Sequence, residues 1–206
     1  MSKVNKSSGN GNSKLKPPTV EFLRELEKHA LEIRKKAGIG PTDKFDPIKR
    51  ASQLQIQVVP VNEIEGLSPQ HLELINRLSP KDWSGSGLSR KLPNGKMLIP
   101  VHPKQTFERM NVTILEEVAH DYYGHQPALL NGNGREGYNP AAEQEAYWTA
   151  AAALLPMKVV ARAVWLGQSA EALGAEFGAS RELAEMRIKI MRLWKEYQSR
   201  SVNGGG

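Results

Sequence analysis

The stretch Thr-Ile-Leu-Glu-Glu-Val-Ala-His-Asp-Tyr-Tyr-Gly-His, residues 113–125, carries a strong helical pattern. At about 100° per residue its apolar side chains gather on one broad face, which must point into a core, and Gly124 is a typical helix stop. Glu116 and His120, four residues apart, stack at the edge of that face. Glu117 is expected beside them, further towards a cleft or solvent. The segment therefore predicts a core helix with ionisable side chains at its margin.

A histidine and two carboxylates at the margin of a core can hold a divalent metal ion with one coordination position open. The spacing is that of H-E-x-x-H, in which two ligands lie at i and i+4 and the intervening glutamate acts as a general base. Here the pattern is E-E-x-x-H, with Glu116 in the place of the first histidine. The predicted metal site thus contains Glu116 and His120 as ligands, with Glu117 in the catalytic position.

A third ligand must come from another helix, and two acidic residues of the segment after residue 139 are candidates. Glu143 and Glu145 lie about 200° apart on a helix, so only one of them can face the site. Glu143 shares a stripe with Tyr147 and with the apolar residues Ala150 and Leu154, which we take as the inward face. We therefore expect Glu143 to be the ligand, and Glu145 to support the site from outside the ligand set.

Two segments together resemble the ImmA/IrrE family of metallopeptidases. They are Glu-Glu-Val-Ala-His-Asp-Tyr-Tyr-Gly-His-Gln-Pro at 116–127 and Glu-Gln-Glu-Ala-Tyr-Trp-Thr-Ala-Ala-Ala-Ala-Leu-Leu-Pro at 143–156. The family pairs an H-E-x-x-H-x-x-x-G-H-x-P helix with an E-x-x-A-x-x-x-A-A-x-L-L-x-P helix. Glu116 departs from this pattern, so the chain resembles a variant E-E-x-x-H branch.

The resemblance implies a zinc-dependent endopeptidase that cleaves a helix-turn-helix repressor and so switches on stress-response or mobile-element genes. It implies Glu117 as the base, and His120 and Glu143 as ligands. A metal-free relative that only binds its protein partner is an open alternative.

Replacing a histidine by Glu116 changes the expected chemistry, because the site gains one negative charge. Zinc accepts carboxylate oxygen, and oxygen-rich sites also suit Mn²⁺, so the selectivity for zinc should fall. The extra charge should leave a metal-bound water less acidic than the pKa of about 7 of efficient zinc hydrolases. We therefore expect weakly bound metal or slow turnover. His125 could replace the missing ligand, but it lies about 140° from His120 on a continuous helix, which favours a supporting role.

The remaining pattern predicts an α+β fold, a small antiparallel sheet packed beside a mainly helical, zincin-like domain with a helical C-terminal appendage. The expected strands are 56–60, 83–92 and 96–101, the last two joined by a turn at Asn94-Gly95. The expected helices are 19–36, 47–54, 69–77, 105–123, 140–155, 157–166, 169–177 and 180–199. The predicted divisions are a flexible leader (1–18), a metallopeptidase-like domain (19–166), an appendage (167–200) and a flexible tail (201–206).

Composition narrows the class of protein. The chain has 206 residues and no cysteine, which suits a reducing, cytoplasmic location and leaves only His, Asp and Glu as metal ligands. No apolar run reaches the length of about 18 residues that a membrane span needs. The net charge is +6, but Lys3, Lys6, Lys14 and Lys16 lie in a leader without acidic residues. The folded part is therefore close to neutral, which weakens a nucleic-acid interpretation.

The strongest rival is a DNA-binding regulator, because residues 169–187 resemble two short helices broken at Gly178, as in a helix-turn-helix. The basic residues Arg181, Arg187, Lys189, Arg192, Lys195 and Arg200 follow, against Glu182, Glu185 and Glu196. The alternative interpretation of this segment is a helical appendage that packs on the rest of the chain.

Overall fold

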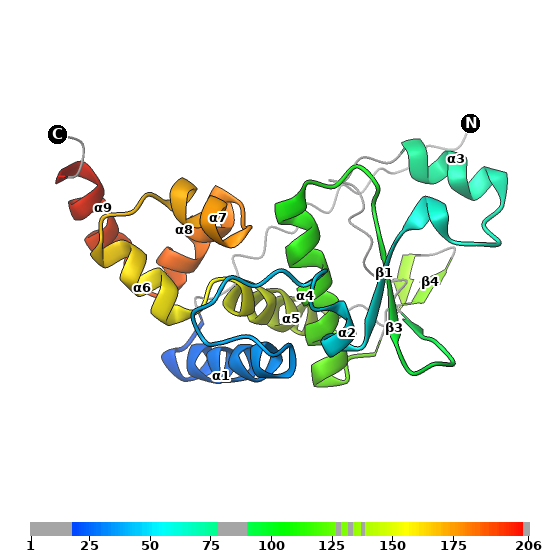
Figure 1. Cartoon of the computed structure of the whole chain (residues 1–206), viewed down its shortest axis with the longest axis horizontal. Coiled ribbons are helices and arrows are strands. Elements are labelled where there is room, and N and C mark those ends of the chain that lie inside the picture. The colour runs from blue at the N-terminus through cyan, green and yellow to red at the C-terminus, as the bar shows by residue number, and fades with distance from the viewer. Residues whose placement is uncertain (1–17, 78–89, 127–128, 132–133, 137–138, 204–206) are drawn as a thin grey trace, which may run out of the picture.

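The computed structural model describes residues 18–77, 90–126, 129–131, 134–136 and 139–203 (Figure 1). Its centre is formed by two crossing helices, α4 (Phe107–Tyr123) and α5 (Pro140–Leu154). A small sheet lies at one end, and the helices from α6 (Met157–Trp165) to α9 (Trp194–Asn203) lie at the other. The α+β class is confirmed, and no described helix is long and apolar enough to cross a membrane.

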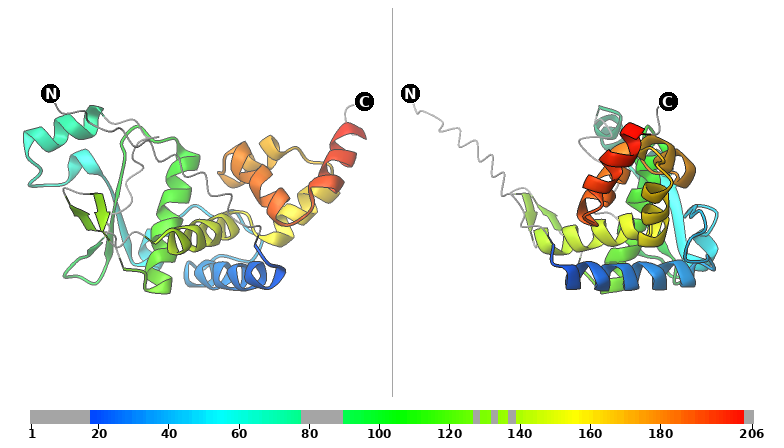
Figure 2. Two further views of the ribbon diagram at one scale, coloured as in Figure 1. Left: turned by 180° about the vertical axis from the view of Figure 1, so that it is seen from behind. Right: turned by 90° about the vertical axis from the view of Figure 1, so that its left-hand side faces the viewer.

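Helix α1 (Val20–Lys36) lies alongside α5, as Figure 2 shows. The alanine run 150–153 of α5 is fully buried, and its small side chains let neighbouring helices approach closely. The threonines before α1 and α4 cap these helices: Thr19 accepts from the Phe22 N–H and Thr106 from the Arg109 N–H. Both helices therefore begin where a side chain satisfies a free backbone donor.

The sheet has the order β1-β3-β2, with β1 at Ile56–Pro60, β3 at Met97–Val101 and β2 at Arg90–Lys91. The expectation of an antiparallel sheet is wrong for its main pair, because β1 and β3 run parallel. The segment between them contains a 3-10 turn (Val61–Glu63) and α3 (Pro69–Arg77), which carry the chain back before β3 begins.

The turn at Asn94-Gly95 forms as expected and makes β2 and β3 an antiparallel pair. Gly95 has a left-handed backbone (φ 79°), and the Leu92 N–H donates to the Lys96 carbonyl over 2.7 Å. Only residues 90–91 of the expected first strand are strand in the described part, and 83–89 lie outside it. A second hairpin, β4 (Leu129–Asn131) with β5 (Gly134–Glu136), was not expected.

Two expected helices differ from the structure. Asp46 caps a turn, accepting from the Lys49 N–H, and α2 is limited to Ala51–Leu54 because Arg50 leaves the helical conformation. The helix expected over 180–199 is two helices, α8 (Arg181–Ile190) and α9 (Trp194–Asn203). The break occurs at Arg192 (φ 62°) and lets α9 fold back, so that the Tyr197 hydroxyl accepts from the Ala170 N–H.

One continuous core joins both ends of the molecule. It includes Ile56 and Ile99 of the sheet, Leu115 of α4 and Leu183 and Ile188 of α8. Helices α6 (Met157–Trp165) and α7 (Ala170–Phe177) connect the centre to α8. The boundary expected after residue 166 stays a prediction, because the segments on its two sides share this core.

Candidate metal centre

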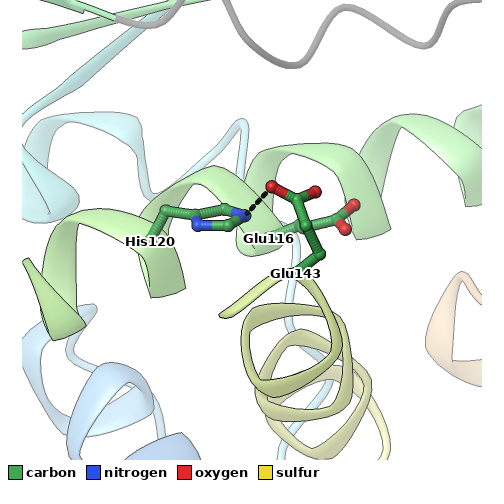
Figure 3. A group of neighbouring side chains, drawn as sticks. All are labelled: Glu116, His120 and Glu143. Carbon is green, nitrogen blue, oxygen red and sulfur yellow. Dashed lines mark ion pairs between the residues drawn. The ribbon is translucent and has the colours of Figure 1, made fainter. Parts of the chain in front are cut away.

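Glu116 and His120 of α4 converge with Glu143 of α5 (Figure 3). One ligand atom from each of the three lies within 4.8 Å of the others. His120 Nε2 lies 3.9 Å from a Glu143 carboxylate oxygen. The fold thus brings two residues of α4 and one residue of α5 together in one cluster.

The start of α5 positions Glu143. Asn139 is the N-cap, accepting from the Ala141 and Ala142 N–H groups, and Pro140 follows at the first helical position, where its missing donor costs nothing. Glu143 therefore lies in the first turn, at the side where α5 meets α4.

The cluster concentrates negative charge. Burial, together with the charges of the Glu117 and Glu143 carboxylates, raises the pKa of the Glu116 carboxyl to about 7 against the opposing effect of Arg109. Burial also lowers the pKa of His120, with Glu143 opposing this change and His125 adding to it. A divalent cation among these groups would supply the missing positive charge, and a neutral imidazole is the form that binds metal.

The donors fit a metal ion in kind and in spacing. Zinc accepts imidazole nitrogen and carboxylate oxygen at about 2.0–2.2 Å, so two ligands of one tetrahedral ion lie roughly 3.4 Å apart. The 3.9 Å between His120 and Glu143 is slightly longer, and small side-chain rotations close the difference. The three residues fit a metal ion on this ground, whereas its identity does not follow from the donors.

Glu117 is a buried residue of the same helix, α4. It is only 6% exposed, whereas its neighbour Glu116 is half-buried. Glu117 was expected to lie further towards a cleft or solvent than Glu116, and its low exposure excludes the solvent alternative. The carboxylate of Glu117 still acts electrostatically on Glu116 and therefore lies close to the cluster.

His125 and Glu145 form a second pair beside the cluster. The Nδ1 atoms of His120 and His125 are 3.0 Å apart, and His125 Nε2 lies 3.3 Å from a Glu145 oxygen. Tyr123 stacks on the His125 ring, with centroids 5.2 Å apart and planes at 18°. Glu143 thus faces His120, and Glu145 faces His125. Both acids belong to this region, and each one contacts a different histidine.

Two tyrosines, Tyr123 and Tyr147, also contact this region. The Tyr123 hydroxyl lies 2.8 Å from Thr149 Oγ1 and 3.0 Å from His29 Nδ1, which links α4 to α5 and α1. Tyr147 lies one turn after Glu143, and its pKa is raised by burial and by the charge of Glu116. The i, i+4 spacing places Tyr147 on the same stripe as Glu143, as the sequence predicts, whereas the partners of Tyr123 depend on packing alone.

The helix-turn-helix-like segment forms α7 and α8, but its basic side chains are largely engaged within the chain. Arg187 is buried and pairs with Glu27 of α1. Arg181 and Lys189 both pair with Glu185. These contacts agree with a helical appendage packed on the rest of the chain and leave fewer free cations for a phosphate backbone.

Comparisons with known proteins give a family for this arrangement. The model of a peptidase family described as the IrrE N-terminal-like domain matches residues 71–189, which include the whole cluster. A solved structure titled Mycobacterium tuberculosis transcriptional regulator is similar, with a TM-score of 0.49 and 15% identity. The similarity covers 81% of this chain and 46% of that one, so this chain spans about half of its length. None of the curated proteins matches the chain.

Proposed function

The chain belongs to the IrrE N-terminal-like peptidase family, whose model matches more than half of it, and from this we propose that it is a metal-dependent endopeptidase. The observation that carries the proposal is the convergence of Glu116, His120 and Glu143 within 4.8 Å. Membership of the family alone would not say which residues bind the metal. The cluster supports Glu116, His120 and Glu143 as the ligands.

In this proposal Glu116, His120 and Glu143 hold Zn²⁺, with Mn²⁺ as the main competitor because two of the donors are carboxylates. The metal would polarise the scissile carbonyl and lower the pKa of a bound water. The three side chains lie between α4 and α5 and are partly buried, with the His120 and Glu143 side chains 19% and 35% exposed. Partial burial strengthens the electrostatic interactions of such a site with the reacting groups, relative to the same interactions in water.

Glu117 is the proposed general base. It would take a proton from the attacking water and return it to the amine that leaves when the peptide bond breaks. Its low exposure of 6% keeps it away from competing solvent, and it sits directly beside Glu116 on α4. Tyr147, near Glu116, is a candidate donor of a hydrogen bond to the substrate.

His125 and Glu145 are proposed to hold the His120 ring in position. If the Nε2 lone pair of His120 is kept for a metal, its proton lies on Nδ1 and is donated to Nδ1 of His125 over 3.0 Å. His125 then carries its own proton on Nε2, 3.3 Å from Glu145. Metal-binding histidines usually donate their second N–H in this way, which fixes both tautomer and orientation.

The proposed substrate is a protein, and specifically a helix-turn-helix repressor in the cytoplasm, in line with the resemblance to ImmA/IrrE sequences. The test is to incubate the zinc-loaded protein with a panel of such repressors and to identify cleavage products by mass spectrometry. Glu117→Gln should abolish cleavage and retain zinc. Glu108→Gln, on the same helix but away from the cluster, should cleave normally.

The outcomes separate the candidate functions. Cleavage that persists in a chelator or in the Glu117→Gln variant would contradict the proposal. A stable repressor complex without zinc uptake or cleavage would instead identify a metal-free binding protein. Tight duplex binding with a steep salt dependence would favour a DNA-binding regulator, although Arg181, Arg187 and Lys189 are paired internally.

A further inference from the structure

An open groove of about 670 Å³ lies between α1, the first residue of α6 and the end of α8. None of its lining residues belongs to the metal centre. Its apolar lining consists of Val20, Leu23, Leu31, Met157, Ile190 and Met191. Val20, Leu31 and Met157 are 43%, 39% and 50% exposed, so the groove presents a continuous apolar floor to solvent. Large apolar patches of this kind on a folded chain usually mark a binding surface.

The rim of the groove is basic. Arg24, Lys35 and Arg192 line it, are exposed, and form no ion pair with any residue in the described part of the chain. A fourth lining cation, Lys28, pairs with Glu25, and the acidic Glu27 pairs with buried Arg187. The other acidic residue, Glu32, accepts from the neutral Tyr122 hydroxyl, so one carboxylate stands against the three cations of the rim. The uncompensated charge around the apolar floor is therefore positive.

The shape favours a helix as the occupant. The lining positions of α1 run from Val20 to Lys35 and follow one helical face. At 1.5 Å per residue this face is about 22 Å long, which accommodates about four turns of a second helix. Amphipathic helices bind such grooves through apolar side chains spaced at i, i+3 or i+4 and i+7.

The charge pattern argues against two other occupants. The leader before α1 contains Lys3, Lys6, Lys14 and Lys16 and no acidic residue, so a basic rim would repel it. A second copy placed face to face would bring the same cations opposite one another, which is unfavourable. We propose that this groove docks an amphipathic helix of a protein partner, with an apolar stripe flanked by glutamate or aspartate residues.

The test uses two fluorescent synthetic peptides of about 18 residues, both with leucines on one helical face. One carries Glu at its flanking positions and the other carries Lys at the same positions. Fluorescence anisotropy with the full chain should show that the acidic peptide binds at least about tenfold more tightly than the basic one. Equal binding of the two peptides, or no binding of either, would overturn the proposal.

Two pairs of matched variants locate the binding surface. Arg24→Glu combined with Lys35→Glu should weaken acidic-peptide binding about tenfold, whereas Lys36→Glu with Lys44→Glu, the same charge change outside the groove, should change it little. Leu31→Gln should also weaken binding, whereas Ile48→Gln, at a similarly exposed position (41%) elsewhere, should not.

Equal losses of binding in the groove variants and the control variants would mean general electrostatic attraction and would overturn the proposal. A dimer that Leu31→Gln abolishes would identify a second copy as the occupant and overturn it as well.

Discussion

His120 and His125 meet across the end of α4, with their Nδ1 atoms 3.0 Å apart. Gly124 makes this contact possible, because its left-handed backbone (φ 68°) ends the helix and turns the chain back. The His125 N–H then donates to the His120 carbonyl oxygen over 3.0 Å. His120 therefore presents one ring nitrogen to Glu143 and the other to His125, and its orientation depends on residues outside the E-E-x-x-H motif.

Removing the acid behind His125 should weaken metal binding without removing a ligand. Glu145→Gln should lower zinc affinity by roughly 10–100-fold, because the His120 ring loses its fixed orientation. Glu143→Gln should cause a larger loss, since it removes a proposed ligand. Zinc titration against a competing chelator measures both, and an unchanged affinity in Glu145→Gln would contradict the supporting role.

Glu116→His should make the site more selective for zinc. The substitution restores an imidazole ligand and removes one negative charge, so the ratio of zinc to manganese affinity should rise. Competition between the two ions in the wild type and the variant gives this ratio. Two results together would show that Glu116 does not weaken the site. The wild-type chain would retain zinc after treatment with a chelator, and Glu116→His would leave turnover unchanged.

The pair of Arg187 and Glu27 should matter for stability, because both side chains are largely buried. Arg187→Met removes one partner, leaves Glu27 without its counter-charge and frees the Leu155 carbonyl. The free energy of unfolding in urea should fall by about 3–5 kcal/mol. Arg181→Met breaks the exposed pair with Glu185 and should leave the free energy of unfolding almost unchanged. Similar effects of the two variants would show that burial does not set the strength of the Arg187 pair.

Gly174 marks a close approach between α7 and the backbone that leads into α8. A Cβ at this position would lie 2.7 Å from the Ala179 carbonyl oxygen, which is backbone and cannot rotate away. Gly174→Ala should therefore destabilise the protein by about 1–2 kcal/mol, despite the better helix propensity of alanine. Ala175→Ser, at an exposed position of the same helix, is the control in thermal unfolding. Stabilisation by Gly174→Ala would mean that α7 and α8 separate easily.

Duplex DNA should bind weakly and with a shallow salt dependence. Several cations of α8 and α9 are already paired, among them Arg181 and Lys189 with Glu185 and Arg200 with Glu196. Few phosphates can then be neutralised, so few counterions are released. Binding measured over a range of salt concentrations gives the slope. A slope that corresponds to many phosphate contacts would revive the DNA-binding interpretation.

Much of the candidate site could be derived from local spacing. The i, i+4 relation places Glu116 and His120 on one face of α4, and the stripe that Glu143 shares with Tyr147 selects it over Glu145. The helix limits follow from caps that are local in the sequence, such as Thr106 and Gly124. These features depend on interactions between residues a few positions apart, so a single sequence determines them.

Only the tertiary structure decided the rest. It placed β1 parallel to β3, buried Glu117, broke the last helix at Arg192 and brought His125 onto His120. Each of these results depends on which surfaces pack together after the chain reverses, and residues distant in the sequence supply the contacts. The sequence by itself determined an α+β chain with an E-E-x-x-H helix and a second acidic helix. Packing determined the orientation of the ligands, because hydrogen bonds between residues distant in the sequence leave no periodic signal along the chain.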